Sequence, residues 1–256
     1  MRFIHDFTLV NNAKYAADVS VLTLQNDSDL PQIAAGQFVE VRVDNTPGVM
    51  LRRPISIHDV NYSKNQIKLM VQNVGKGTDA LCRLAVGATL NVLYPLGAEF
   101  PVPEQGKQPL LIGGGCGVAP LLYLGRCFLN NGITPCFLLG FRSMSTLIET
   151  KTYSELGEVM ITTEDGSVGH KGYVVNHPVM CSETPNFDTI YTCGPEIMMK
   201  AVAKYAEQHG MECYASLENR MACGIGACLC CVAPTVEGNK CTCVEGPVFN
   251  SKYLQW

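Results

Sequence analysis

Six of the thirteen cysteines in this 256-residue chain lie between Cys223 and Cys243. Three of them follow the spacing Cys223-x4-Cys228-x2-Cys231, which is typical of the ligands of plant-type [2Fe–2S] clusters. Two glycines lie inside the first interval, where a loop wrapped around a cluster needs close backbone approach and unusual dihedral angles. The pattern predicts that these three thiolates bind a [2Fe–2S] cluster and that loop amides donate hydrogen bonds to its sulfurs.

Two candidates remain for the fourth ligand, Cys241 and Cys243. We favour Cys243, because a Gly-Pro pair follows it closely and can turn the chain sharply. A structural zinc site that combines Cys228 and Cys231 with these two cysteines is a competing interpretation, as is simple packing of thiols as small apolar side chains. The spacing and the loop glycines favour the cluster, with Cys230 taking no part.

A glycine-rich turn follows an apolar segment near the middle of the chain. Leu110-Leu111-Ile112 runs directly into Gly113-Gly114-Gly115-Cys116-Gly117, and a helix is expected over residues 119–130. A strand that enters such a turn and opens a helix can bind a pyrophosphate at the helix N-terminus. The match to G-x-G-x-x-G is imperfect, so an ordinary tight turn is the alternative. We expect Gly113, Gly114, Gly115 and Gly117 to approach a dinucleotide.

Other predicted strands also end in residues suited to ligand binding. Cys193-Gly194-Pro195 follows an expected strand over 189–192, and Arg142 follows one over 135–139. The carboxyl ends of parallel strands form the ligand crevice of a doubly wound sheet, so Cys193, Gly194 and Pro195 are expected to line it. Arg142 could accept a 2′-phosphate or face solvent, which leaves NAD and NADP both open. Routine strand-to-helix turns are the alternative interpretation.

The N-terminal half contains a second candidate binding motif, Arg53-Pro54-Ile55-Ser56. Arg53 could neutralise a dinucleotide phosphate while Ser56 hydrogen-bonds the edge of a flavin ring. Arg52 is then expected to point the opposite way, to solvent. An edge strand with two surface arginines is the competing interpretation.

The elements that must position these residues fall into three regions. Alternating apolar and polar residues over 19–24, 37–43 and 66–71 predict antiparallel strands, which would close into a small barrel. Short apolar strands then alternate with helical stretches, as in a doubly wound parallel α/β sheet. We therefore expect an FAD-binding β-barrel over 1–102, an NAD-binding α/β domain over 103–215 and a small [2Fe–2S] module over 216–256. Cofactor ligands, more than a hydrophobic core, would hold the last of these together.

Composition excludes several classes of function. The net charge of −4 and the lack of a basic stripe argue against nucleic-acid binding. The N-terminus lacks the features of a signal peptide, and the longest apolar stretch, 109–125, is broken by glycine and proline, so no membrane span is expected. A thiol-rich chain of this kind is expected in the reducing cytoplasm.

Together these motifs resemble the ferredoxin-reductase flavoprotein family. Arg53 to Ser56 is similar to its flavin motif, Gly113 to Pro120 to its nicotinamide-nucleotide loop, and Cys193-Gly194-Pro195 to its motif beside the nicotinamide. The stretch from Ser216 to Cys228, with Cys243-x-x-Gly246-Pro247-Val248-Phe249, resembles the electron-transfer subunits of dihydroorotate dehydrogenase B. By this resemblance FAD would be lined by two further groups of residues: Met70, Val71 and Gln72, and Gly77 and Thr78.

The resemblance implies an oxidoreductase subunit that holds FAD and one [2Fe–2S] cluster and uses NAD as acceptor. It also implies an FMN-containing catalytic subunit as partner, two copies of each chain, and a role in pyrimidine biosynthesis. Electrons would pass from the FMN of the partner through the cluster and FAD to NAD⁺. A flavoprotein subunit of an NAD(P)H:ferredoxin or sulfide oxidoreductase is the nearest alternative. A zinc-stabilised, non-enzymatic binding module is an alternative of another class.

Overall fold

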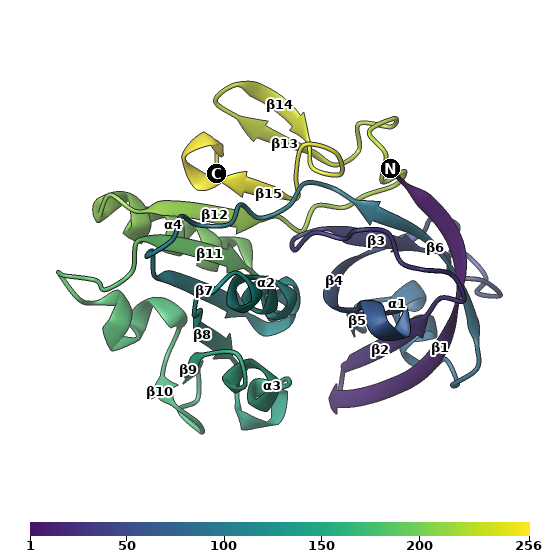
Figure 1. Ribbon diagram of the computed structural model, residues 1–256, viewed down its shortest axis with the longest axis horizontal. Coiled ribbons are helices and arrows are strands. Elements are labelled where there is room, and N and C mark those ends of the chain that lie inside the picture. Colours follow the sequence, from purple (N-terminus) through teal and green to yellow (C-terminus); the bar gives the residue numbers. More distant parts are fainter.

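The computed structural model describes residues 1–256 and begins with a closed antiparallel barrel (Figure 1, purple to blue). The barrel order is β1-β2-β5-β4-β3-β6. Its strands are β1 (Phe3–Ala16), β2 (Val19–Gln25), β3 (Phe38–Val41), β4 (Arg53–Asn61), β5 (Gln66–Gln72) and β6 (Thr89–Leu96). A short helix, α1 (Lys76–Cys82), follows β5. The predicted barrel is confirmed, and its interior is filled by alternate apolar residues such as Phe7, Leu9, Leu22 and Leu24.

The second body is a seven-stranded sheet in the order β10-β9-β8-β7-β11-β12-β15. Its strands are β7 (Pro109–Gly114), β8 (Cys136–Phe141), β9 (Glu158–Thr163), β10 (His170–Lys171), β11 (Thr189–Cys193), β12 (Glu212–Ser216) and β15 (Val248–Asn250). All neighbours are parallel except β12 and β15. The strand order reverses between β7 and β11, which is where a doubly wound sheet binds its ligand. The predicted parallel α/β fold is confirmed.

Three helices accompany this sheet: α2 (Ala119–Asn130), α3 (Thr150–Ser154) and α4 (Glu196–Gln208). Helix α2 has the bounds that the sequence predicts, and Pro120 in its first turn suits a position where a backbone N–H has no helical partner. Almost every residue of its first two turns is buried, because α2 lies between the sheet and the barrel (Figure 1). Single 3-10 turns occupy Tyr62–Lys64, Gly115–Val118, Met144–Thr146, Val174–Asn176, Pro178–Met180 and Ser251–Tyr253.

The C-terminal region packs on both bodies and does not depend on ligands alone. Strands β13 (Val232–Thr235) and β14 (Gly238–Cys241) form a hairpin, while β15 joins the large sheet. The buried cysteines Cys231 and Cys243 pack against Phe38 and Leu96 of the barrel. A second apolar cluster joins this region to α4 and β12 through Met199, Ala215, Phe249 and Leu254. Apolar contacts therefore anchor this region, beside the cofactor ligands that the sequence predicts to hold it together. The domain boundaries stay a prediction.

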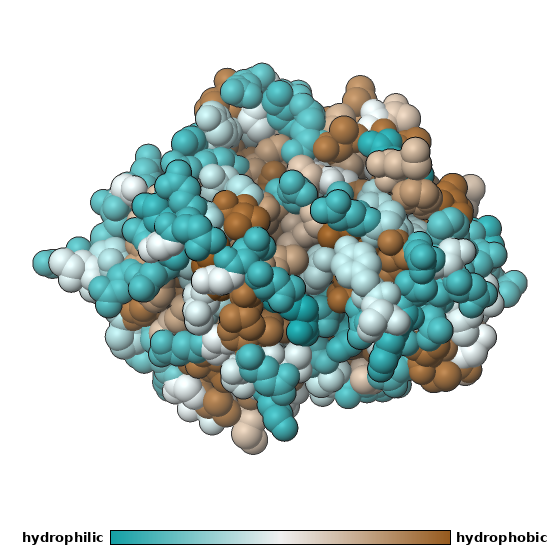
Figure 2. Space-filling view, viewed as in Figure 1, coloured by the Kyte–Doolittle hydropathy of each residue, from teal (hydrophilic) through white to brown (hydrophobic).

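Two further properties concern the chain as a whole. None of its helices combines the length and apolar character needed to cross a membrane. Hydrophobic surface gathers at the upper right of Figure 2, above the loop that precedes β13 and beside the N-terminus. Ile225, Leu229 and Val244 are exposed in this region. An exposed apolar patch of this kind is typical of an interaction surface.

Candidate nucleotide pocket and cluster loop

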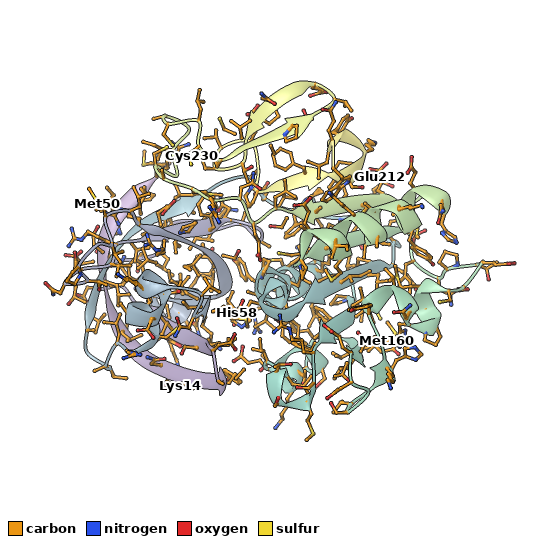
Figure 3. The ribbon with its side chains drawn as sticks, turned by 180° about the vertical axis from the view of Figure 1, so that it is seen from behind. Lys14, Met50, His58, Met160, Glu212 and Cys230 are labelled. Carbon is orange, nitrogen blue, oxygen red and sulfur yellow. The ribbon has the colours of Figure 1, made fainter.

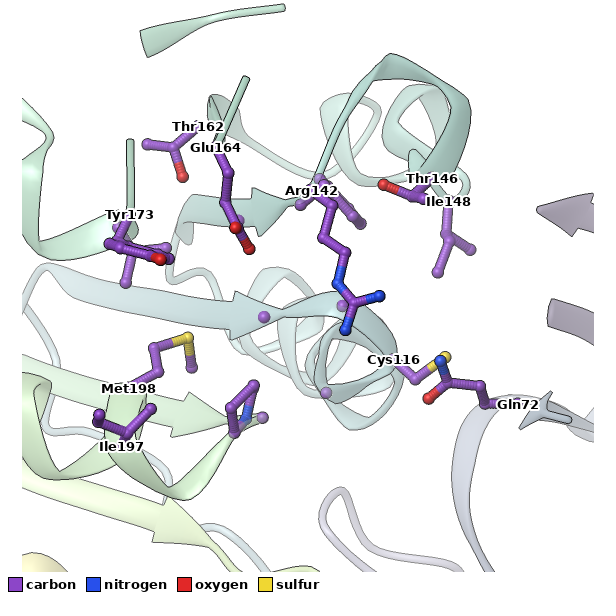
Figure 4. A pocket seen from close by; sticks show the side chains of 18 of the residues that line it. Gln72, Cys116, Arg142, Thr146, Ile148, Thr162, Glu164, Tyr173, Ile197 and Met198 are labelled. Atoms are coloured by element: carbon purple, nitrogen blue, oxygen red, sulfur yellow. The ribbon is translucent and has the colours of Figure 1, made fainter. Parts of the chain in front are cut away.

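A cavity of about 800 Å³ lies where β7, β8, β9 and β11 end, opposite one edge of the barrel (Figure 4). The large sheet supplies most of its wall, and Asp18 and Gln72 come from the barrel. Because the cavity sits at the reversal of strand order, it occupies the place where doubly wound sheets bind nucleotides.

The glycine-rich turn and the Cys193-Gly194-Pro195 segment meet at this cavity. Gly114, Gly115, Gly117, Gly194 and Pro195 line it. A Cβ atom at Gly117 would collide with the backbone at the end of β11, so only glycine lets the turn come this close. Gly113 is buried inside β7 against Val118 and Leu121, and therefore supports the turn from beneath without lining the cavity.

Two charged side chains extend into the cavity from neighbouring strand ends. Figure 4 shows Arg142, after β8, and Glu164, after β9, side by side, both extending into the opening. Arg142 thus faces the ligand space, which was one of the two orientations left open by the sequence. The sequence places the segment of Glu164 just after a predicted strand, at the ligand crevice, but assigns it no role, because the ribose-binding acid is expected about twenty positions after the glycine turn, well before β9.

Glu218 is a second acidic residue that the motifs did not single out. It borders this cavity and also a smaller one of about 380 Å³ between the large sheet and the C-terminal hairpin. The buried thiol of Cys193 donates to Oε1 of Glu218 at 3.8 Å, and burial raises the pKa of both groups. Glu218 follows β12, which pairs in parallel with β11, and this position at the ligand-binding edge of the sheet could have indicated it.

The residues of the flavin motif lie outside the wall of the large cavity. The guanidinium of Arg53 lies against Gly77, where a Cβ atom would collide with Nε of Arg53. Thr78 organises the adjoining turn: its Oγ1 accepts from the amides of Val74 and Gly75 at 2.9 and 3.1 Å. Arg53, Gly77 and Thr78 are thus brought together, whereas none of them lines the large cavity.

The other residues predicted to line FAD lie on strands β4 and β5. Pro54, Ile55 and Ser56 are half-buried on β4, and Met70 and Val71 are buried on β5. Gln72 is exposed at the end of β5, where it also borders the cavity. Gln72 is therefore the residue that adjoins both the predicted flavin site and the nucleotide pocket.

The orientation predicted for Arg52 is wrong. Its Nη1 donates to the carbonyls of Glu40 and Asn91 at 3.2 and 3.0 Å, and its Nη2 donates to Oδ1 of Asn91 at 2.5 Å. Arg52 precedes β4, so the alternation of side chains along that strand does not govern it. Its guanidinium instead satisfies acceptors on β3 and at β6, which a planar group with five donors does well.

The four cysteines predicted as ligands come together in two pairs. Cys223 pairs with Cys228, and Cys231 with Cys243: within each pair, one thiol lies close enough to shift the pKa of the other. Backbone amides also point at these sulfurs: the amide of Gly226 donates to Sγ of Cys243 at 3.1 Å, and that of Cys243 to Sγ of Cys231 at 3.4 Å.

This donor set fits a two-iron cluster, because each iron of a [2Fe–2S] cluster takes two thiolates. Burial would raise the pKa of Cys223, yet hydrogen bonds from the amides of Ile225, Cys228 and Ala227 lower it to about 6. The loop therefore favours the thiolate, the form that binds iron, at Cys223, whereas burial raises the pKa of Cys243 to about 12.

The two candidates for the fourth ligand differ in their surroundings. The side chain of Cys243 is completely buried, and its sulfur accepts the amide of Gly226. Cys241 is half-buried, and its amide donates to Oε2 of Glu245 at 2.7 Å. The burial and the amide contact of Cys243 favour it over Cys241.

Glu40 lies directly beneath this loop and was not anticipated. Its side chain is fully buried and neither carboxyl oxygen has a hydrogen-bond partner. Burial raises its pKa to about 7, in spite of the nearby charge of Arg52. A Cβ at Gly224 would lie 2.7 Å from Cγ of Glu40, so the glycine makes room for the carboxylate.

Comparison with known proteins identifies the family. Residues 6–100 match the model of an oxidoreductase FAD-binding domain, and residues 218–255 match that of the iron–sulfur cluster binding domain of dihydroorotate dehydrogenase B. The chain is 39% identical to the electron transfer subunit of dihydroorotate dehydrogenase B (NAD⁺) from Shouchella clausii over 249 residues, 94% of each chain. The chain belongs to the family of these electron transfer subunits. The family predicted from the motifs is thereby confirmed.

Other relatives agree with this membership. The electron transfer subunit from Bacillus mycoides is 38% identical, again over 94% of each chain. Among solved structures, an NADH-dependent reduced ferredoxin-NADP oxidoreductase studied for electron bifurcation superposes with a TM-score of 0.88 at 29% identity, covering 98% of this chain and 90% of that one. The cytochrome P450 reductase GcoB from Amycolatopsis has a TM-score of 0.71 at 25% identity, over 82% of this chain and 68% of that one.

Proposed function

We propose that this chain is the electron transfer subunit of an NAD-dependent dihydroorotate dehydrogenase of pyrimidine biosynthesis. The observation that carries the proposal is the match to such subunits over 94% of the chain. A cavity at the strand ends of the large sheet and a four-cysteine region packed on the barrel support it. FAD, when bound, can exchange single electrons with an iron–sulfur cluster and a hydride with nicotinamide, so it links the two chemistries. The chain's own contribution is to bind and orient these groups.

The large cavity is the proposed NAD site. The amides of Gly114, Gly115 and Gly117 would hold the pyrophosphate, with Gly113 supporting the turn from within β7, and the segment Cys193-Gly194-Pro195 would adjoin the nicotinamide. Their meeting at one wall of the cavity supports this assignment. Glu164 supports NAD as the acceptor, since a carboxylate can hydrogen-bond a ribose hydroxyl and repels a 2′-phosphate.

The strand face of β4 and β5 is the proposed FAD site. Arg53 would neutralise the phosphates from its place against Gly77, and Thr78 holds the neighbouring turn. Pro54, Ile55 and Ser56, together with Met70, Val71 and Gln72, would line the flavin. The match of residues 6–100 to an FAD-binding domain supports this location.

The proposed cluster ligands are Cys223, Cys228, Cys231 and Cys243. Their pairing and the amides directed at their sulfurs support a [2Fe–2S] cluster. Ile225 and Leu229 lie exposed in the same loop and would contact the catalytic subunit, because apolar surface beside an electron-transfer group suits a partner interface.

The partner proposed for this chain is a catalytic subunit that holds FMN and oxidises dihydroorotate. The names of the relatives, electron transfer subunits of a dehydrogenase, imply a catalytic partner subunit. FMN in that subunit, and an assembly with two copies of each chain, extend the proposal. We further propose a cytoplasmic location, because a chain with thirteen thiols suits a reducing compartment.

An anaerobic visible spectrum tests the cofactor assignment. The purified chain, analysed for iron and acid-labile sulfide, is expected to show flavin and cluster bands that NADH bleaches. Mixed with the FMN subunit and dihydroorotate, it should then reduce NAD⁺. A flavin spectrum without iron would reduce the proposal to a simple NADH–flavin reductase. A reducible cluster without activity toward dihydroorotate would point to a different donor.

A further inference from the structure

A buried ion pair joins the barrel to the nucleotide-binding body. His58 of β4 is fully buried, and its Nε2 lies 2.5 Å from Oε2 of Glu149, whose side chain is 6% exposed. Figure 3 shows His58 between the two bodies. The other oxygen of Glu149 accepts the hydroxyl of Tyr15, at 2.7 Å, from the end of β1. Three segments far apart in sequence thus meet at one carboxylate.

Both nitrogens of the imidazole face acceptors. Nδ1 of His58 lies 2.8 Å from the carbonyl oxygen of Ala119, the first residue of α2, while Nε2 faces Glu149. A carbonyl oxygen only accepts hydrogen bonds, so Nδ1 donates to Ala119, while Nε2 shares a proton with the carboxyl group of Glu149. Although burial opposes it, the hydrogen bond and charge of His58, with help from Tyr15 and Lys68, lower the pKa of Glu149.

The neighbours of this network form the nucleotide pocket and the flavin strand. Ala16 follows Tyr15, Ile148 precedes Glu149, and Gly117 lies two residues before Ala119; all three line the cavity. On the barrel side, His58 lies two residues after Ser56 of the flavin motif.

The backbone of Glu149 has φ +46°, a left-handed conformation that costs energy in a residue with a side chain. Such a residue persists only where its surroundings hold it. The contacts of its carboxylate with His58 and Tyr15 supply that support.

We propose that His58 and Glu149, supported by Tyr15, act as positioning residues that set the distance between the flavin strand and the nicotinamide pocket. This inference rests on the proposed function. Hydride transfer requires donor and acceptor atoms in close, fixed contact, and a small displacement is costly. A buried hydrogen-bonded pair that anchors the first turn of α2 to β4 fixes the two binding sites relative to each other.

A second interbody ion pair provides a matched control. Arg126 of α2 binds Asp59 through two hydrogen bonds of 3.0 and 3.1 Å. It joins the same helix to the same strand, but the arginine is 37% exposed and neither residue lines the cavity. Breaking this pair should therefore lower stability without changing hydride transfer.

The test is anaerobic stopped-flow reduction of bound FAD by NADH in the full chain. In Glu149→Gln and His58→Gln we expect the limiting rate per bound FAD to fall roughly tenfold or more. FAD content should be unchanged, and the long-wavelength charge-transfer absorbance formed with NADH should weaken. Glu149→Asp should recover part of the rate, and Arg126→Gln should keep it within about twofold.

The alternatives give different results. A purely structural pair would lower the unfolding temperature or the FAD content while leaving the rate per bound FAD unchanged, and that result overturns the inference. If Glu149→Gln does not fold, Tyr15→Phe replaces it as the test. This variant removes only the hydroxyl that donates to Glu149, and it should still lower the limiting rate. Failure of NADH to reduce the FAD of the unaltered chain would instead contradict the proposed function.

Discussion

Glu40 combines full burial with a carboxyl group that no donor satisfies. Burial raises its pKa from 4.5 to about 7, so the folded chain binds this proton more tightly than the unfolded chain does. A raised pKa means that the stability linked to this group is complete below about pH 4 and is lost as the pH rises through about 7. The energy involved is on the order of 3 kcal/mol.

Glu40→Gln should remove this dependence on pH. Between pH 5 and pH 8 we expect the unfolding temperature of the cofactor-loaded wild-type chain to fall, and that of the variant to fall less, because glutamine does not titrate. Glu104→Gln, at an exposed position, is the control and should follow the wild type. Parallel curves for wild type and Glu40→Gln would show that the buried carboxyl finds a partner in solution.

At the scale of elements, α1 carries Gly77 against the guanidinium of Arg53. Gly77 does not have a positive φ, so its need for glycine comes from space and not from backbone conformation. Alanine is the better helix former and would stabilise α1 if the contact did not matter. An alanine at position 77 should therefore favour the helix α1 but collide with the side chain of Arg53.

Gly77→Ala should displace Arg53 and weaken FAD binding by roughly tenfold or more, the loss expected when a charge-assisted contact with phosphate is impaired. Gly75→Ala is the matched control, since a Cβ atom there meets nothing within 4 Å. The measurement is a titration of the FAD-depleted chain with FAD, followed by flavin fluorescence. Equal affinities for the two variants would mean that Arg53 does not hold the phosphates.

The elements best predicted from sequence are those with a local signal. Helix α2 and strands β2 and β5 match the expected ranges closely, because continuous periodicity and the glycine turn mark them. Strand β15 was not expected: it is short, and only its pairing with β12 defines it. Glu40, His58 and Glu149 were missed for the same reason. Their burial depends on which distant segment covers them, and no local pattern carries that information.

At the scale of the whole molecule, the cluster loop and the nucleotide pocket are built almost independently. No cysteine of the cluster loop lines the large cavity, and Glu218 is the only contribution of the C-terminal range to its wall. The end of the chain is anchored by apolar contacts, since Phe249 and Leu254 pack on Met199 and Ala215 without any cluster ligand. A substitution that removes the cluster should therefore leave the reaction with NADH at the nucleotide pocket intact.

Cys243→Ser should abolish the cluster and leave NADH chemistry intact. We expect iron and sulfide to fall almost to zero and NAD⁺ reduction by dihydroorotate with the partner to be lost. NADH-dependent reduction of ferricyanide should stay within about twofold of wild type, because distant sites without shared partners act independently. Cys241→Ser is the control and should keep its iron. If Cys241→Ser loses its iron and Cys243→Ser does not, the fourth ligand is Cys241. Loss of ferricyanide reduction in Cys243→Ser would mean that the cluster also holds β15, and through it the sheet that forms the nucleotide pocket.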